Sequence, residues 1–132
     1  MVVFLDTSAI YALANQSDPN HRSATQLFRA ALEAGIDFLV HNYIILESLA
    51  LLQTRGGWRA VNRFLSAPYP LRVRWVDEAL HRAALRQFMD RRGKFSLVDE
   101  VSFLVMQEAA VAQALAFDRH FIDRGFSLYR GS

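Results

Sequence analysis

Four acidic side chains, spread along the whole chain, carry the chemistry that this sequence could perform. They are Asp6, Glu47, Asp99 and Asp118. Carboxylates brought close together raise each other's pKa values, and a divalent cation removes that penalty. A set made only of oxygen ligands suits hard ions such as Mg²⁺ or Mn²⁺ rather than zinc. One such ion, or a pair, would lower the pKa of bound water and polarise a phosphodiester.

Two of these acids follow short apolar runs that are typical of buried strands. Asp6 comes directly after Val2–Leu5, and Asp118 comes directly after Ala114–Phe117. In a parallel sheet, ligands bind beyond the carboxyl ends of the strands, at the point where the strand order reverses. Aspartate also caps helices and turns, so for each residue alone a structural role is as well supported as a functional one.

Glu47 is the most informative of the four because of its helical neighbours. Residues three and four positions away are all apolar or aromatic: Tyr43, Ile44, Ala50 and Leu51. A carboxylate on such a face has a large desolvation cost unless it is paired or binds a metal ion. The alternatives are an arginine salt bridge or a position at the rim of the core.

Asp99 has the strongest structural alternative. The spacing from Ser96 resembles a capping box, in which Asp99 would be a first-turn acid favoured by the helix dipole. Both roles are compatible, because a helix start often points into an active site. Glu100 is the reserve candidate if the helix register differs, and His120 is the histidine nearest to one of the acids in sequence.

The elements that must position these residues alternate between strands and helices. Strands are predicted at 2–5, 37–41, 114–117 and 126–129, and 71–76 fits a strand or an extended connection. Helices are predicted at 7–13, from an Asp18 cap with Pro19 in the first turn to Gly35, from an Asn42 cap to about 55, and at 58–65, 77–92 and 96–111. This alternation favours an α/β fold with a mainly parallel sheet, in one domain covering residues 1–132.

Composition limits the class of protein. Hydrophobic residues make up 52% of the 132 residues and charged residues 21%, which provides for a core and argues against disorder. No run approaches the roughly 20 apolar residues of a membrane span, and no signal peptide is recognisable. There are no cysteines, which excludes thiolate metal sites. We expect a cytoplasmic protein without a membrane partner.

The positive charge is almost entirely arginine. The net charge is +2, and Lys94 is the only lysine. Arginine donates paired hydrogen bonds to phosphate, so this composition permits nucleic-acid binding without requiring it. The arginines with the best sequence position for RNA contact are Arg119, Arg124, Arg91 and Arg92.

Four segments, in this order, resemble the PIN-domain nucleases, especially toxins of the VapC type. They are Leu5–Ala9, Glu47 in its apolar helix, Ser96–Asp99 with Ser102-Phe103 beyond it, and Ala116–Phe121 followed by Gly125-Phe126. No single segment is specific, but the ordered set covers nearly the whole chain. One departure is Ala116, where many members carry Thr or Ser.

The resemblance implies a three-layer α/β/α sandwich and an Mg²⁺- or Mn²⁺-dependent endoribonuclease. It implies that the four acids are the catalytic and metal-binding set, supported by the hydroxyl of Thr7 or Ser8. It also implies a homodimer that is silenced by a cognate antitoxin protein. The departure at Ala116 removes one supporting hydrogen bond.

Two other functions fit parts of the pattern. A phosphoacceptor signalling domain also places aspartates at strand ends, but it needs a lysine near a late strand, and Lys94 precedes a helix. A non-catalytic PIN-like module that binds RNA is the closer alternative. The presence of all four acids argues against it.

Overall fold

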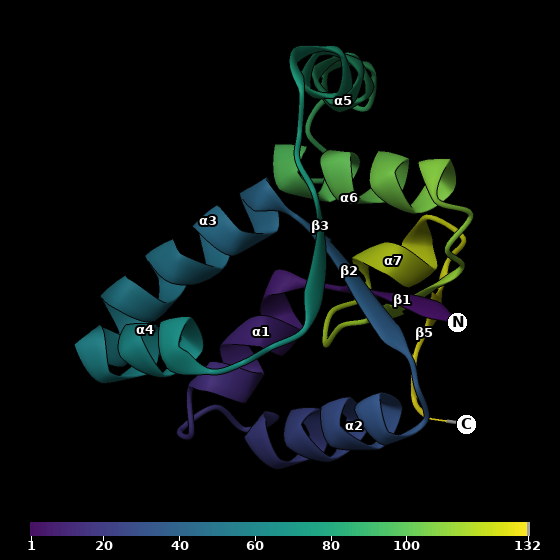
Figure 1. Cartoon of the computed structure of the whole chain (residues 1–132). Coiled ribbons are helices and arrows are strands. Elements are labelled where there is room, and N and C mark those ends of the chain that lie inside the picture. The colour runs from purple at the N-terminus through teal and green to yellow at the C-terminus, as the bar shows by residue number, and fades with distance from the viewer. Residues whose placement is uncertain (132) are drawn as a thin grey trace.

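The computed structural model describes residues 1–131, in which helices enclose a five-stranded sheet whose strands are all parallel (Figure 1). The strand order is β3-β2-β1-β4-β5. The strands are β1 (Val2–Leu5), β2 (Asp37–His41), β3 (Leu71–Arg74), β4 (Gln113–Leu115) and β5 (Ser127–Leu128). The predicted α/β class with a parallel sheet is confirmed.

The helices fall into two layers. They are α1 (Thr7–Ala14), α2 (His21–Glu33), α3 (Asn42–Leu51), the π-helical turn η1 (Leu52–Gly56), α4 (Gly57–Ser66), α5 (Glu78–Asp90), α6 (Leu97–Glu108) and α7 (His120–Asp123). Right-handed crossovers place α1–α4 on one face of the sheet and α5–α7 on the other. Figure 1 shows this separation, with α6 and α7 above the sheet and α1 and α2 below it.

The order of the strands reverses next to β1. From β1 the chain adds β2 and β3 on one side, then crosses back to add β4 and β5 on the other side. The reversal therefore lies between β1 and β4, which pair in parallel with Leu5 opposite Leu115. The backbone N–H of Asp6 donates to the Leu115 carbonyl at 3.1 Å, which extends this pairing to the residue after β1.

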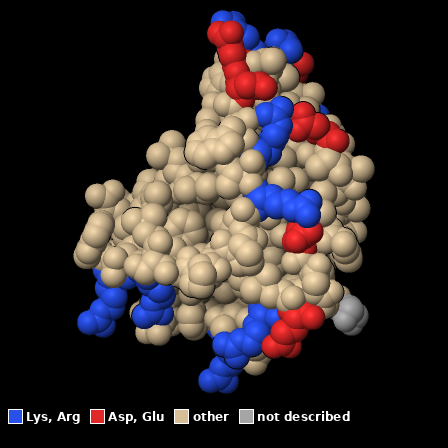
Figure 2. Space-filling view, viewed as in Figure 1, with Lys and Arg blue, Asp and Glu red and all other residues tan. Residues whose placement is uncertain are grey.

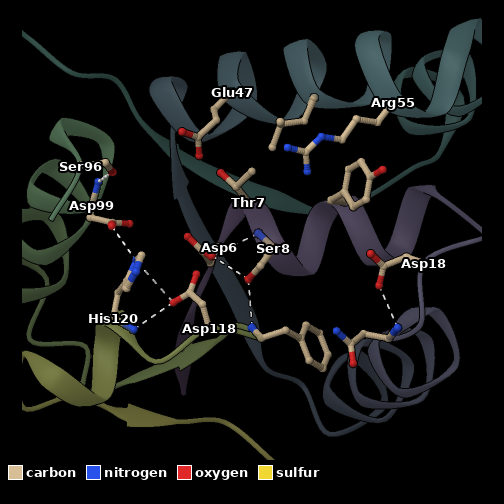
Figure 3. A pocket seen from close by; sticks show the side chains of 14 residues that line it. Asp6, Thr7, Ser8, Asp18, Glu47, Arg55, Ser96, Asp99, Asp118 and His120 are labelled. Atoms are coloured by element: carbon tan, nitrogen blue, oxygen red, sulfur yellow. Dashed lines mark hydrogen bonds and ion pairs between the residues drawn. The ribbon is translucent and has the colours of Figure 1, made fainter.

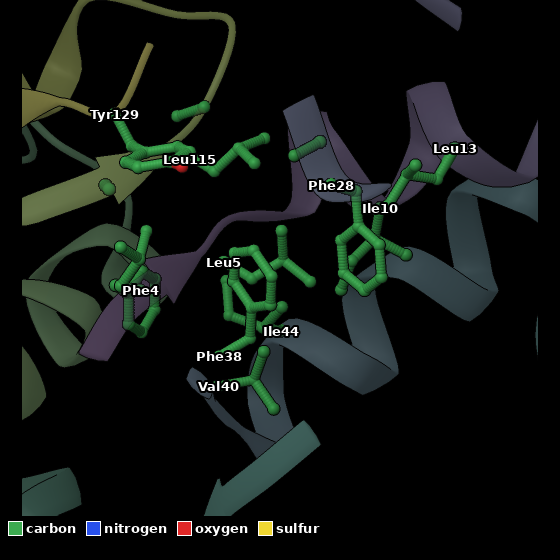
Figure 4. Close-up of a cluster of buried hydrophobic side chains, with 14 of the residues drawn as sticks. Phe4, Leu5, Ile10, Leu13, Phe28, Phe38, Val40, Ile44, Leu115 and Tyr129 are labelled. Carbon is green, nitrogen blue, oxygen red and sulfur yellow. The ribbon is translucent and has the colours of Figure 1, made fainter. Parts of the chain in front are cut away.

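Apolar side chains on both faces of β1 and β2 build the core (Figure 4). Phe4 and Phe38 are fully buried, and Phe38 stacks on Phe28 of α2 with a centroid distance of 4.7 Å. On the other face, Phe4 packs against Phe121 at 5.9 Å. Strands buried on both sides must be apolar throughout rather than alternating, which explains the continuous run Val2–Leu5.

The predicted start of α2 is wrong by two residues. Its N-cap is Asn20, and the helix begins at His21. The Asp18 carboxylate instead accepts a hydrogen bond from the Asn20 N–H at 2.8 Å, two residues on. Aspartate competes for nearby backbone donors in this way, so Asp18 and Pro19 form a turn before the helix rather than its first turn.

The predicted cap of α3 is also wrong. His41 Nδ1 accepts from the Ile44 N–H at 3.3 Å, while the Asn42 side chain accepts from the Val76 N–H at 2.6 Å. Burial lowers the pKa of His41 to about 3, so the ring is neutral. Its Nε2 lies 2.9 Å from the Ser102 Oγ, which links the start of α3 to α6.

Several other predicted boundaries shift. The helix expected to run to about 55 changes to π-helical hydrogen bonding at Leu52 and turns at Gly57, whose φ is +72°. Helix α6 ends at Glu108 rather than at 111, and the last two strands are shorter than predicted. Helix α7 was not predicted, because four residues carry no periodicity.

Candidate active site

A pocket of about 400 Å³ opens at the carboxyl end of β1, where the strand order reverses. All four acids predicted from the sequence line it: Asp6, Glu47, Asp99 and Asp118. Figure 3 shows their side chains pointing toward one another from α3, α6 and the segments after β1 and β4. Residues that are up to 112 positions apart therefore share one cavity.

Asp6 is the buried centre of this group. Its Oδ2 accepts hydrogen bonds from the Ser8 N–H at 3.1 Å and the Ser8 Oγ at 2.7 Å. It is therefore the N-cap of α1 as well as a pocket residue. Burial first, and then the Asp118 carboxylate, raise the pKa of Asp6 to about 7, although the Ser8 hydrogen bonds oppose the rise.

The two hydroxyl side chains after Asp6 behave differently. Ser8 Oγ donates to Asp6 and accepts from the Phe117 N–H at 2.9 Å, so it ties the acid to the chain after β4. Thr7 Oγ1 is buried and has no hydrogen-bond partner within residues 1–131, although Thr7 lines the pocket.

His120 connects two of the acids. Its Nδ1 lies 2.8 Å from Asp99 Oδ2 and 3.8 Å from Asp118 Oδ1, and its backbone N–H donates to Asp118 Oδ1 at 3.0 Å. Burial raises the pKa of Asp99, and the His120 ring opposes that rise. Asp99 also uses its backbone N–H to bond Ser96 Oγ at 3.0 Å, which confirms Ser96 as the cap of α6.

Glu47 extends from α3 toward Asp6 and Thr7 (Figure 3). It is half-buried and makes no salt bridge with any of residues 1–131, so the predicted alternative of an arginine pair is not found there. Arg55 lines the same pocket from η1. The carboxylate of Glu47 is therefore free to bind a ligand that enters the cavity.

The donors of the pocket fit a hard divalent cation in kind. They are carboxylate oxygens and the Thr7 hydroxyl, and the Asp118 carboxylate lies close enough to raise the pKa of Asp6. No three acidic or histidine side chains of residues 1–131 stand in a ready-made metal-binding group. The side chains that would hold such an ion are Asp6, Glu47, Asp99 and Asp118.

Glu100 and the arginines suggested for RNA contact lie outside the pocket. Glu100 is buried and pairs with Arg91 at 3.0 Å, so Glu100 does not join the four acids. The Arg124 guanidinium lies over the Phe103 ring at 5.2 Å. Arg92 and Arg119 are exposed. Contact of these four arginines with RNA stays a prediction.

Eight residues that line the pocket were not selected as site residues from the sequence: Tyr11, Asp18, Asn20, Leu51, Arg55, Ser96, Phe117 and His120. His120 was named only as an open question, because a lone histidine gives no spacing signal. Arg55 was not considered at all, although a signal existed: residues 48–76 contain arginines but no acid.

Comparison with known proteins identifies the family. The protein-family model of the PIN domain matches residues 3–127 of the sequence. The chain belongs to the PIN-domain family. Helices long and apolar enough to cross a membrane are absent from residues 1–131 of this PIN domain.

Relatives of this PIN domain match it over nearly the full length. The 23S rRNA-specific endonuclease VapC20 of Mycobacterium tuberculosis is 31% identical over 129 residues, which are 95% of each chain. The crystal structure of VapC20, described as a sarcin–ricin loop cleaving toxin, superposes with a TM-score of 0.80 at 29% identity and 96% coverage of both chains. The family and fold predicted from the sequence are thus confirmed.

Proposed function

We propose that this PIN domain is a metal-dependent endoribonuclease and the toxin of a toxin–antitoxin pair. The observation that carries the proposal is the convergence of four acids in one pocket of a PIN fold. A domain that only bound RNA would have no use for buried, mutually repelling carboxylates. A phosphoacceptor domain is disfavoured because Lys94, the only lysine, does not line the pocket.

Asp6, Asp99, Asp118 and Glu47 would hold Mg²⁺ or Mn²⁺. An ion of this kind, when bound, lowers the pKa of a water molecule and polarises the phosphodiester. Ser8 fixes the orientation of Asp6 through two hydrogen bonds. His120 holds the Asp99 carboxylate from the side facing Asp118.

For the substrate, we propose a structured RNA loop, in the first place the sarcin–ricin loop of 23S rRNA. The support is the full-length similarity to VapC20, which is named for this activity. We further propose a cytoplasmic homodimer that is inhibited by a cognate antitoxin, because the sequence resembles VapC-type toxins across its whole length.

The test incubates purified protein with a labelled sarcin–ricin stem-loop, a scrambled stem-loop and single-stranded RNA, with Mg²⁺, Mn²⁺ or EDTA. We expect cleavage only with a divalent ion, and a loss of about a hundredfold or more in Asp99→Asn. Asp90→Asn, at an exposed position on α5, is the matched control and should keep full activity. Equal cleavage by Asp99→Asn and wild type would refute the assignment of the site.

A second experiment tests the toxin role separately. Expression of the wild type alone should arrest growth, and expression of Asp6→Asn should not. Normal growth with soluble, RNA-cleaving wild-type protein would exclude the toxin role and leave the nuclease in place.

A further inference from the structure

Helix α4 and the η1 turn before it carry arginines without acidic partners. Residues 48–76 contain no aspartate or glutamate. Within this segment Arg72 pairs with Asp37 and Arg74 pairs with Glu108. Three other arginines make no salt bridge with any residue of the described part of the chain: Arg55, Arg59 and Arg63.

These three arginines line two hollows that adjoin. Arg55 lines the acid pocket, and Arg59 and Arg63 line a second hollow of about 160 Å³. The hollows meet where Asn15, in the second, donates to the Tyr11 hydroxyl, in the first, at 2.9 Å. Arg55, Arg59 and Arg63 therefore form a series that leads from the acid pocket into the adjoining hollow.

Two glycines at the junction of η1 and α4 fix how α4 packs against the η1 turn. Gly57 has a φ of +72°, a conformation that favours glycine. A Cβ on Gly56 would stand 2.7 Å from the Ala60 Cβ, so α4 packs closely against the turn only because glycine is there. Arg59 and Arg63 are four residues apart in α4 and thus share a face. Figure 2 shows Lys and Arg side chains below α4, at the lower left, without Asp or Glu beside them.

A pocket lined by acids repels the phosphates of its own substrate. Binding a polyanionic strand there requires cations on the path that the strand takes away from the pocket. Arginine suits that task, because its guanidinium donates paired hydrogen bonds to phosphate. With the Gln16 side-chain amide turned so that its oxygen faces Arg63, the Arg63 guanidinium donates to that oxygen at 2.7 Å, which orients the guanidinium in the hollow.

We propose that Arg55, Arg59 and Arg63 form an arginine track that binds the RNA backbone beyond the cleaved bond. The track rests on the proposed ribonuclease function. An acidic protein segment would be attracted to the same charges, but the continuity with the acid pocket favours a strand that occupies both hollows at once.

The test measures RNA binding apart from cleavage, in an Asp6→Asn background. Fluorescence anisotropy follows a labelled stem-loop RNA across a series of salt concentrations. We expect Arg59→Gln/Arg63→Gln to weaken binding by roughly tenfold, and to reduce the slope of log K against log salt by about two. Arg86→Gln changes an exposed arginine of α5 that has no salt bridge in residues 1–131. It removes one positive charge, as Arg59→Gln alone does, and should change neither value.

Two further variants separate binding from folding. Arg59→Gln alone leaves the Arg63–Gln16 bond intact and should reduce the slope by about one, with an unchanged thermal midpoint. Arg59→Lys keeps the positive charge and should restore most of the salt slope that Arg59→Gln loses. In the active enzyme, the double variant should raise KM while kcat stays near the wild-type value, because the arginines lie away from the acids.

The outcomes distinguish the track from the nuclease. If wild type cleaves RNA and the double variant keeps wild-type affinity and salt slope, the track is wrong and the nuclease stands. If the double variant keeps wild-type affinity for RNA but loses binding to a polyglutamate peptide, the arginines bind an acidic protein and the track is again wrong. If wild type neither binds nor cleaves RNA, both proposals fail.

Discussion

Asp6→Asn should stabilise the metal-free protein at neutral to alkaline pH. The Asp6 side chain is buried, and its pKa stands at about 7 in the folded protein against an ordinary value of 3.8. The folded state therefore binds more protons than the unfolded state between these values, so the free energy of unfolding falls as pH rises through this window. The full difference corresponds to about 4 kcal/mol above pH 7.

Asparagine removes this penalty without removing the cap of α1. Its side-chain oxygen can still accept from the Ser8 N–H and Oγ, as Asp6 Oδ2 does. At pH 8 with EDTA, the variant should unfold at a temperature about 10 °C above that of wild type. This difference in unfolding temperature should disappear near pH 4. A divalent ion at about 100 times its dissociation constant should then stabilise wild type by about 2.7 kcal/mol, and the variant much less.

The assay is thermal and urea unfolding followed by circular dichroism, at pH 4, 6 and 8, with EDTA or with Mn²⁺. Asp90→Asn removes an exposed charge and controls for net charge. A melting temperature for Asp6→Asn at or below that of wild type at pH 8 would refute the reasoning. A gap that is equally large at pH 4 would show that the gain has another cause.

Three further predictions concern the framework, and urea unfolding measures each. His41→Phe removes a buried cap and a buried hydrogen bond to α6 and should cost about 2–4 kcal/mol. Phe121→Ala should cost about 3–5 kcal/mol because its ring is fully buried, whereas Leu65→Ala, 59% exposed, should stay within about 0.5. Arg74→Ala breaks a salt bridge with the exposed Glu108 and should lower the free energy of unfolding by less than about 1 kcal/mol. In high salt, wild type and variant should be equally stable.

Two neighbouring strands of the sheet, β1 and β2, were predictable from apolar runs in the sequence. Strands buried on both faces leave continuous apolar runs, and 2–5 and 37–41 were predicted with the bounds that the structure has. Helix starts were less predictable, because several side chains compete for the same backbone donors. At α3, His41 and Asn42 are both able to cap, and only the distant Val76 N–H decides which one does.

The acids were easier to find than their neighbours. Glu47 stands out because an ionised side chain on an apolar helix face has a physical cost that is visible in sequence. His120 has no such signal, since its relation to Asp99 depends on where the short helix α7 lies. The same holds for Arg55, whose place in the pocket depends on the π-helical turn that follows α3.

The strand order explains why acids so distant in sequence meet. Apolar runs alone permit many parallel orders, and most would leave Asp6 and Asp118 at separate edges of the sheet. In this order β1 and β4 are neighbours at the reversal, so no crossover helix covers the gap beyond their ends. Ser8 closes the arrangement, because its hydroxyl holds Asp6 while it accepts from the Phe117 N–H. The hydrogen bond from the Phe117 N–H to Ser8 thus links the ends of β1 and β4 without a hydroxyl at position 116.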